Sequence, residues 1–235
     1  MIRSLYRRAD KNIFTVPLDA VPWLSPAQRK AAFIPIGANV PEQMNRRSAL
    51  ASSDEVKTVV VFGVTGAPQM EHEVREIAGV MRKVNSVVKK LRLVVIGRGA
   101  LEAKAQLATT LMGSNVELVV RGVLPAEEVA QEFEYADALL FVRGPLTITR
   151  GSALAAIASG VPVVGFRGKN IMGPLEYAGI EWAPCGDPAD LARALTIVLT
   201  DPMRWKELHE RNIQVQRKFF SWTEIAERFA AELTV

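Results

Sequence analysis

Two arginines frame a turn near the middle of the chain whose residue types suit the binding of a diphosphate. Arg143 follows an apolar run, and Arg150 directly precedes Gly151 and Ser152, where a helix of small residues is expected to begin. The first N–H groups of a helix have no partner within it and lie at the positive end of the helix dipole, so they attract anions. The two arginines could donate charge-assisted hydrogen bonds to the same anion. The alternative is that both arginines are solvated residues of a connecting loop.

Glycine, often with arginine, also follows the other apolar runs. The residues of these two types at the predicted strand ends are Gly63, Gly66, Gly97, Arg98, Gly99, Arg121, Gly122, Gly168 and Gly173. In an open parallel sheet, ligands bind outside the carboxyl ends of the strands. Glycine lets the backbone approach a ligand closely, although glycine after a strand is also ordinary turn chemistry. Together these residues favour a nucleotide or another phosphorylated ligand, and Gly63, Gly66, Arg98 and Arg121 are candidate contacts for its nucleotide or sugar.

Other nucleotide-binding and metal-binding motifs are poorly matched. Gly97-Arg98-Gly99 supplies only half of the G-x-G-x-x-G pattern, because Glu102 stands where the third glycine belongs, and no P-loop with its lysine is present. An NAD-binding oxidoreductase is therefore the weaker alternative. Cys185 is the only cysteine and the chain has two histidines, so we expect neither an internal disulfide nor a metal site built from Cys and His.

Length and composition indicate one large α/β domain, or one domain with sizeable appendages. The chain has 235 residues, of which 49% are apolar, and a net charge of +4. No apolar run approaches the roughly 20 residues that span a bilayer, and the first residues lack the apolar core of a signal peptide. We therefore expect a cytoplasmic protein. The dispersed positive charge suits an anionic ligand or a membrane surface, and no basic stripe interleaved with aromatics indicates nucleic acid.

From residue 57 onward, six apolar runs alternate with helical patterns. The predicted strands cover residues 58–62, 91–96, 116–120, 137–142, 161–166 and 180–183. The predicted helices cover 74–88 and 100–112 and begin after Pro125, at Gly151 and after Asp187-Pro188. Because the runs are almost continuously apolar, we expect the strands to be buried on both faces. The sequence thus predicts an α/β fold with a doubly wound, six-stranded parallel Rossmann-like sheet.

The amino-terminal residues read as an addition to this core. A short helix is expected to carry an apolar stripe opposite three arginines, and its basic side could contact anionic lipid at the inner face of a membrane. The stripe consists of Ile2, Leu5, Tyr6 and Ala9, and the arginines are Arg3, Arg7 and Arg8. A strand at 12–16 and an extended, proline-rich connector at 33–41 follow. Residues 42–56 are polar and small, which is typical of a linker or mobile loop.

Two helices are predicted at the carboxyl end, at 203–219 and 221–233. Ser221 and Glu224 fit a capping box at the start of the second. The second helix carries an apolar stripe of Ile225, Phe229, Ala230 and Leu233. A stripe of this kind needs a partner surface, which a missing domain or a second copy of the chain could supply.

Several segments, taken in order, resemble a known enzyme family. They are Phe33-Ile34-Pro35-Ile36-Gly37-Ala38-Asn39, Gly97-Arg98-Gly99, Arg121-Gly122-Val123-Leu124, Tyr135-Ala136-Asp137-Ala138, the block 152–164 and Phe220-Ser221-Trp222. This order resembles the nucleotide-sugar-binding half of GT-B glycosyltransferases, and most closely the retaining group 1, or family 4, type that includes bacterial cell-surface polysaccharide transferases. The resemblance covers most of residues 30–235, and 155–164 is its most specific part.

The resemblance implies a division of the chain. Residues 1–41 would be a remnant of the amino-terminal domain together with the linker between the two domains. Residues 42–56 would be a polar loop. Residues 57–200 would be the nucleotide-sugar-binding domain, half of a GT-B fold. Residues 201–235 would be helices that pack on the first domain, most of which lies outside this chain.

The resemblance also implies an activity. Such enzymes transfer a sugar from a nucleotide diphosphate sugar, of UDP or GDP type, to a polysaccharide, lipid or other acceptor. Backbone N–H groups at a helix start and nearby cations stabilise the diphosphate, without a metal or another cofactor. Carried over by position, the helix start is Gly151, Ser152 and Ala153, and Arg143 and Arg150 are the candidate cations.

The chain departs from the family where the family usually has glutamates. Retaining members carry two glutamates separated by seven residues, and those positions hold Thr147, a candidate sugar contact, and Ala155, which accepts no ribose hydrogen bond. The catalytic residues are therefore unknown. The family's arginine and lysine after its first strand correspond to positions near Val64 and Gln69. Two hypotheses follow: a divergent enzyme whose arginines at 98, 143 and 150 bind phosphate, or a non-catalytic nucleotide-binding or interaction module.

Overall fold

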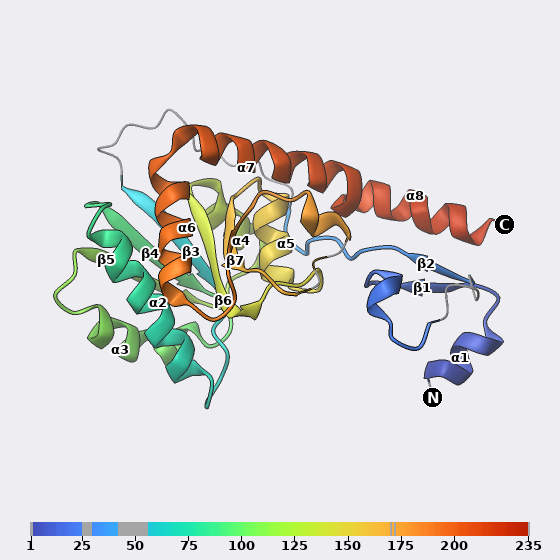
Figure 1. Ribbon diagram of the computed structural model, residues 1–235, viewed down its shortest axis with the longest axis horizontal. Helices are drawn as coiled ribbons and strands as arrows, with labels where there is room; N and C mark the ends of the chain where they lie inside the picture. The colour runs from blue at the N-terminus through green and yellow to red at the C-terminus, as the bar shows by residue number, and fades with distance from the viewer. Residues whose placement is uncertain (1, 25–29, 42–55, 170, 172, 235) are drawn as a thin grey trace.

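Six parallel strands form the central sheet of the protein (Figure 1). The structure is a computed structural model and describes residues 2–24, 30–41, 56–169, 171 and 173–234, so the predicted polar loop at 42–56 lies almost entirely outside the described residues. The strands are β3 (Lys57–Phe62), β4 (Leu91–Ile96), β5 (Val116–Gly122), β6 (Ala138–Pro145), β7 (Val163–Phe166) and β8 (Ile180–Ala183). Their order is β5-β4-β3-β6-β7-β8, which winds outward in both directions from the β3–β6 pair. The predicted doubly wound parallel sheet is confirmed.

Helices cover both faces of the sheet, because alternate strand residues point to opposite sides and are apolar on each. The helices between the strands are α2 (Met70–Asn85), α3 (Ala100–Leu111), α4 (Ala126–Glu134), α5 (Gly151–Ala158) and α6 (Pro188–Thr200). On β3, Val59 and Val61 belong to the core with α2, α3 and α6, whereas Val60 between them belongs to the core with α4 and α5. β3 is therefore held between two apolar layers, as predicted, whereas the edge strand β5 is only half-buried and exposes Glu117 and Arg121.

Most predicted boundaries agree with the structure to within a few residues, and β6 shows the instructive difference. The sequence predicts that this strand ends at Val142, but it continues to Pro145. Its register with β7 pairs Phe141 with Gly165 and then Pro145 with Phe166, so residues 142–144 form a bulge. A bulge leaves residues out of the ladder and redirects their side chains. Arg143 therefore projects from an irregular strand rather than from the loop that follows it.

The amino-terminal elements form a small separate layer. They are α1 (Ile2–Arg8), β1 (Asn12–Phe14), the short helix η1 (Leu18–Ala20) and β2 (Ala31–Phe33), with β1 and β2 paired in parallel. Tyr6 is buried and packs its ring against Phe14 and Trp23, while Ile2 and Leu5 are exposed. The predicted short helix is confirmed, but of the residues assigned to its apolar stripe only Tyr6 is buried, because it packs on the two aromatic rings while Ile2 and Leu5 stay in solvent.

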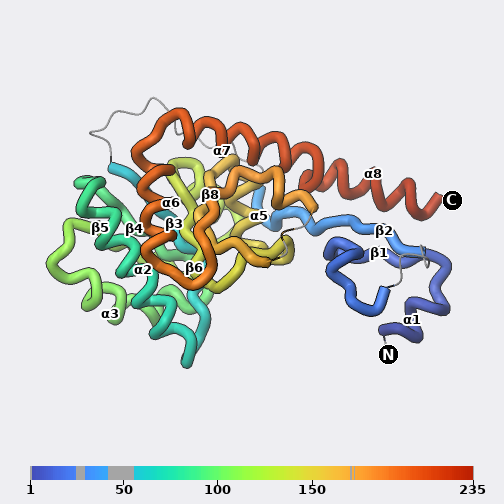
Figure 2. Tube along the Cα trace, viewed as in Figure 1, coloured from blue at the N-terminus to red at the C-terminus, as the bar shows by residue number. Residues whose placement is uncertain are grey.

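The carboxyl-terminal helices run along the top of the molecule in Figures 1 and 2. They are α7 (Pro202–Val215), the π-helical turn η3 (Gln216–Phe220) and α8 (Trp222–Leu233). The helix predicted at 203–219 is confirmed in its extent, and its last turn is π-helical. The Ser221 hydroxyl accepts the N–H of Glu224, which confirms half of the predicted capping box. The other half does not form, because the Ser221 N–H donates to the Gln216 carbonyl and the Glu224 carboxylate accepts from Arg228. Trp222 Nε1 donates to the Ala38 carbonyl at 3.0 Å, which ties α8 to the connector leading from β2. The start of α8 and the connector after β2 thus lie side by side.

Within the described residues, no helix is both long and apolar enough to cross a bilayer. Over the same residues, no three or more His, Cys, Asp or Glu side chains are grouped so that they could hold a metal ion.

Candidate functional site

The main candidate site lies where the winding of the sheet changes direction. A cavity of about 650 Å³ opens at the carboxyl ends of the neighbouring strands β3 and β6. Its lining includes Gly63, Gly66, Arg98, Arg143, Arg150, Gly151 and Ser152, which are all among the residues that the sequence singles out. The strand order reverses here, and the loops that leave the two strands diverge to opposite faces and create a crevice.

Arg143 bridges the two halves of this cavity. Its Nη2 donates to the Phe62 carbonyl at the end of β3 at 3.2 Å and to the Ser152 hydroxyl in α5 at 2.8 Å. The guanidinium also lies over the ring of Phe141, 5.2 Å from its centre. Burial lowers the pKa of Arg143, the charge of Glu73 raises it and Arg150 lowers it, and arginine stays protonated throughout the working range of a protein. A fixed positive charge therefore stands at the switch point.

The start of α5 supplies backbone donors to the same cavity. Among the described residues, the N–H groups of Gly151 and Ser152 have no backbone acceptor, while the N–H of Ala153 donates to the Arg150 carbonyl at 3.0 Å. Ala153 is therefore already satisfied, which reduces the predicted trio of donors to two. Beside them, the buried Nε of Arg150 has no hydrogen-bond partner among the described residues, and its guanidinium lies 5.8 Å from the centre of the Phe141 ring. Arg150, Gly151 and Ser152 all line the cavity, so backbone donors and a guanidinium border the same space, where an anion would be stabilised.

The loop after β3 forms the opposite wall, and two features hold it in place. Glu73, in the first turn of α2, is buried and its Oε2 accepts the N–H of Thr65 at 2.8 Å. Gly99 has a φ of +77°, and a Cβ there would stand 2.1 Å from the Val64 carbonyl oxygen, so only glycine fits. Sequence reasoning treated the Gly97-Arg98-Gly99 turn as a ligand contact and missed Glu73. An acidic residue in a helix first turn is too common to single Glu73 out.

A second cavity adjoins the first. It measures about 460 Å³ and is mostly apolar, with Leu146, Thr147, Ile148 and Thr149 on one side and residues from 16–22 on another. Thr149 lines both cavities, and its Oγ1 lies 3.2 Å from that of Thr147. Thr147, one of the two residues at the family's glutamate positions, therefore faces the second cavity. Ala155, the other, is buried in α5.

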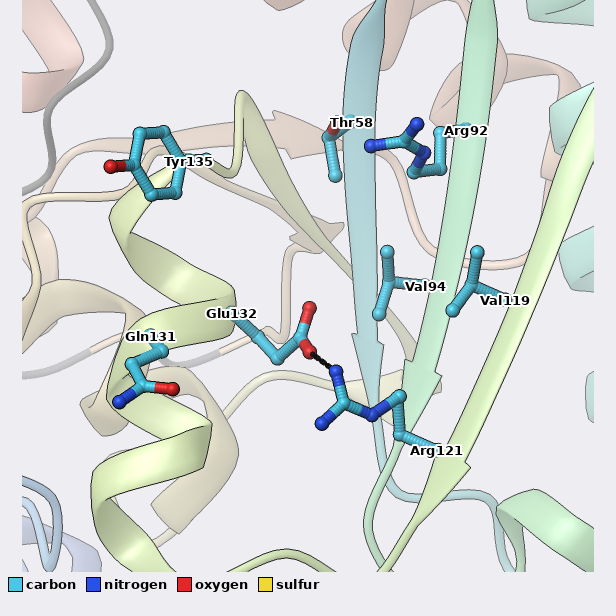
Figure 3. A pocket seen from close by; sticks show the side chains of 8 residues that line it. All are labelled: Thr58, Arg92, Val94, Val119, Arg121, Gln131, Glu132 and Tyr135. Carbon is cyan, nitrogen blue, oxygen red and sulfur yellow. Dashed lines mark hydrogen bonds and ion pairs between the residues drawn. The ribbon is translucent and has the colours of Figure 1, made fainter.

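Arg121 lies outside both cavities. It lines a separate pocket of about 330 Å³ on the sheet face below α4, where Figure 3 shows Arg92 and Thr58 at one end and Arg121 with Glu132 at the other. Its guanidinium pairs with Glu132 at 2.6 Å and Glu128 at 3.1 Å. The prediction that Arg121 contacts the nucleotide is therefore not supported at this cavity. Its side chain points to the α4 face, away from the switch point.

Comparison with known protein families shows to which family the chain belongs. The family described as "Glycosyl transferases group 1" matches residues 57–201, which is more than half of the chain and includes the whole six-stranded sheet. The chain belongs to the group 1 glycosyltransferases. The resemblance inferred from the sequence motifs is therefore confirmed at the level of family and fold. No curated protein matches this sequence in a direct comparison of sequences.

Solved structures of group 1 and other GT-B glycosyltransferases share the fold. Anabaena HepE, solved with UDP and glucose, superposes with a TM-score of 0.69 at 14% identity, over 99% of this chain and 65% of its own. Sucrose-phosphate synthase from Thermosynechococcus elongatus gives 0.66 at 20% identity, over 98% of this chain and 59% of its own. Staphylococcus aureus TarM, in a complex that contains UDP, gives 0.67 at 13% identity, over 98% and 45%. The chain thus spans less than two thirds of each of these glycosyltransferases.

Proposed function

We propose that this glycosyltransferase binds a nucleotide diphosphate sugar, of UDP or GDP type, with its diphosphate in the cavity at the β3–β6 switch point. The observation that carries the proposal is that one cavity is lined by Arg143, Arg150, Gly151 and Ser152, and that the N–H groups of the last two have no backbone acceptor among the described residues. Charge-assisted and backbone hydrogen bonds of this kind suit phosphate oxygens. HepE and TarM were solved with UDP, which supports the nucleotide class.

In the proposed reaction, the same groups stabilise the leaving diphosphate. The bond between the anomeric carbon of the sugar and the diphosphate oxygen breaks, and negative charge builds up on that oxygen. Fixed donors aimed at a developing charge lower the barrier, because they need no reorganisation. The proposal assigns this work to Arg143 and the start of α5, without a metal or another cofactor. The sugar and the acceptor hydroxyl would lie toward the adjoining cavity beside Thr147 and Thr149.

The acceptor and the partner domain are further parts of the proposal. We assign the acceptor to the polysaccharide, lipid or other hydroxyl compounds of cell-surface polysaccharide synthesis. The exposed side of α8, which carries Trp222, Phe229 and Leu233, is the proposed seat of an amino-terminal acceptor domain. A second copy of the chain is the alternative occupant, and light scattering at high concentration distinguishes the two.

The alternative function is a non-catalytic nucleotide-binding or interaction module. Thr147 and Ala155 at the family's glutamate positions favour it, because neither side chain carries a carboxylate. Sugar transfer from UDP- or GDP-linked donors, by this chain joined to an amino-terminal domain, would exclude this alternative. An NAD-binding oxidoreductase is the weaker reading and requires NAD(H) binding.

Calorimetric titration of the chain with UDP, GDP, ADP and NAD, with sodium pyrophosphate as a charge control, tests the proposal. We expect UDP or GDP to bind selectively, since the cavity supplies diphosphate donors and its remaining lining can contact a base. Pyrophosphate should bind more weakly because it lacks the nucleoside. Absence of binding by a folded chain would contradict the donor site, and binding of NAD alone would support the oxidoreductase.

We also propose that the protein is cytoplasmic and contacts the inner face of the membrane through α1. Its last turn carries Arg7 and Arg8, and Ile2 and Leu5 are exposed beside them. Each basic residue near an anionic bilayer contributes about 1 kcal/mol. Replacing both arginines (Arg7→Glu with Arg8→Glu) should reduce binding to phosphatidylcholine–phosphatidylglycerol vesicles by about tenfold or more in a sedimentation assay.

A matched pair of charge reversals elsewhere controls for net charge. Lys83→Glu with Lys104→Glu changes the charge equally on α2 and α3, both far from α1 in the chain, and should leave vesicle binding largely unchanged. Equal losses in the two double variants, or binding that ignores the anionic lipid, would rule out a specific role for α1.

A further inference from the structure

The carboxylate of Glu73 lies behind the wall of the cavity in which the proposed function places a diphosphate. Glu73 is only 5% exposed and contacts the site indirectly, through its 2.8 Å bond with the N–H of Thr65. Its charge acts on Arg143, whose pKa is lowered by burial and raised by Glu73. A negative charge beside an anion site weakens anion binding, so a role in positioning the loop alone does not account for a carboxylate here.

The charges in and behind the cavity match one class of ligand better than another. Three arginines line the cavity, at 98, 143 and 150, and the Glu73 carboxylate reduces their summed charge to +2. A nucleotide diphosphate sugar carries two negative charges, one on each phosphate. A free nucleoside diphosphate carries a third on its terminal phosphate once the pH exceeds the second phosphate pKa of about 6. The substrate is thus matched in charge, whereas the product has one negative charge in excess.

We infer that Glu73 sets the specificity of the site for the nucleotide sugar over the free nucleoside diphosphate. Its negative charge disfavours the extra charge on the terminal phosphate of the product. Release of the product after transfer is thereby eased, and inhibition by the product is limited. The inference rests on the proposed donor site. In it, Glu73 positions the Thr65 loop and selects between the two ligands by its charge, without touching either.

The test compares two substitutions that separate charge from position. Glu73→Gln removes the charge but keeps an amide oxygen that can accept the Thr65 N–H, whereas Glu73→Ala removes both. Dissociation constants for UDP and UDP-glucose, and for GDP and GDP-mannose, are measured by calorimetry at about pH 8, where the terminal phosphate carries both charges. Glu76→Gln is the matched control, because Glu76 is also buried on α2, one turn further along.

In Glu73→Gln we expect affinity for the nucleotide sugar to rise about threefold and affinity for the free diphosphate to rise about tenfold, because the repulsion that the substitution removes scales with the charge on the nearest phosphate. Glu73→Ala should weaken both ligands, since the loop loses its anchor. Glu76→Gln should leave the ratio unchanged.

Equal gains for the two ligands, or a Glu73→Gln variant that behaves like Glu73→Ala, would overturn the inference while leaving the proposed donor site intact. If the unmodified chain binds neither member of either ligand pair, the proposed function and this inference fall together.

Discussion

Arg143→Ala should weaken binding of the nucleoside diphosphate by about 5- to 150-fold, which corresponds to about 1–3 kcal/mol for hydrogen bonds to a charged group. The loss combines two effects. The cavity loses a half-buried positive charge, and Ser152 and the Phe62 carbonyl lose the donor that holds the two sides of the switch point together. Calorimetric titration with UDP and GDP measures the effect directly.

Two further variants make this result specific. Arg143→Lys keeps the charge but cannot present a planar fork of donors, so its affinity should fall between those of the unmodified chain and Arg143→Ala. Arg121→Ala removes an arginine that pairs with Glu128 and Glu132 on another face, so it should leave affinity unchanged. Unchanged affinity in Arg143→Ala, or an equal loss in Arg121→Ala, would place the diphosphate elsewhere.

The fold could be predicted from the sequence because its signals are local and repeated. The first five strands of the sheet are apolar runs that end at or just before glycine or arginine, and the runs β4 and β8 begin and end where the pattern predicts. Asp187, an N-cap expected from its place before a proline, accepts the N–H of Ala189 as expected. Features encoded within a few neighbouring residues are the ones that sequence reasoning recovers.

The details of the site depend on contacts between distant residues, and these were partly missed. Glu73 acts through Thr65 and Arg143, and nothing in its neighbouring residues marks it out. The bulge in β6 arises from pairing with β7, so the sequence of β6 alone predicts an earlier end. The place of Arg121 at a strand end predicts a ligand contact, but its side chain points to the α4 face and pairs with Glu132 there. Residue type and position along a strand therefore indicate where a site lies. Which side chains line it depends on tertiary packing.

The packing of α7 against the turns that lead into β7 and β8 shows how a polar residue can fix the carboxyl-terminal helices. Asn212 is fully buried, and its Oδ1 accepts the N–H of Gly179 at 2.6 Å. Its Nδ2 donates to the Val161 carbonyl at 2.7 Å and to that of Gly179 at 3.3 Å. These bonds join α7 to the chain just before β7 and just before β8. A Cβ on Gly179 would meet the Leu208 carbonyl oxygen at 1.8 Å, so the helix backbone lies directly on this turn.

Asn212→Ala should therefore lower the free energy of unfolding by about 3 kcal/mol, because it removes three hydrogen bonds and leaves buried backbone groups without partners. For a chain of this size the melting temperature should fall by roughly 6–12 °C. Denaturant unfolding followed by circular dichroism measures the change. Asn115→Ala is the control, since Asn115 is exposed and its substitution should cost less than about 0.5 kcal/mol. A loss below about 1 kcal/mol in Asn212→Ala would mean that α7 is held mainly by its apolar contacts, with Trp205 and Leu208 as the anchors.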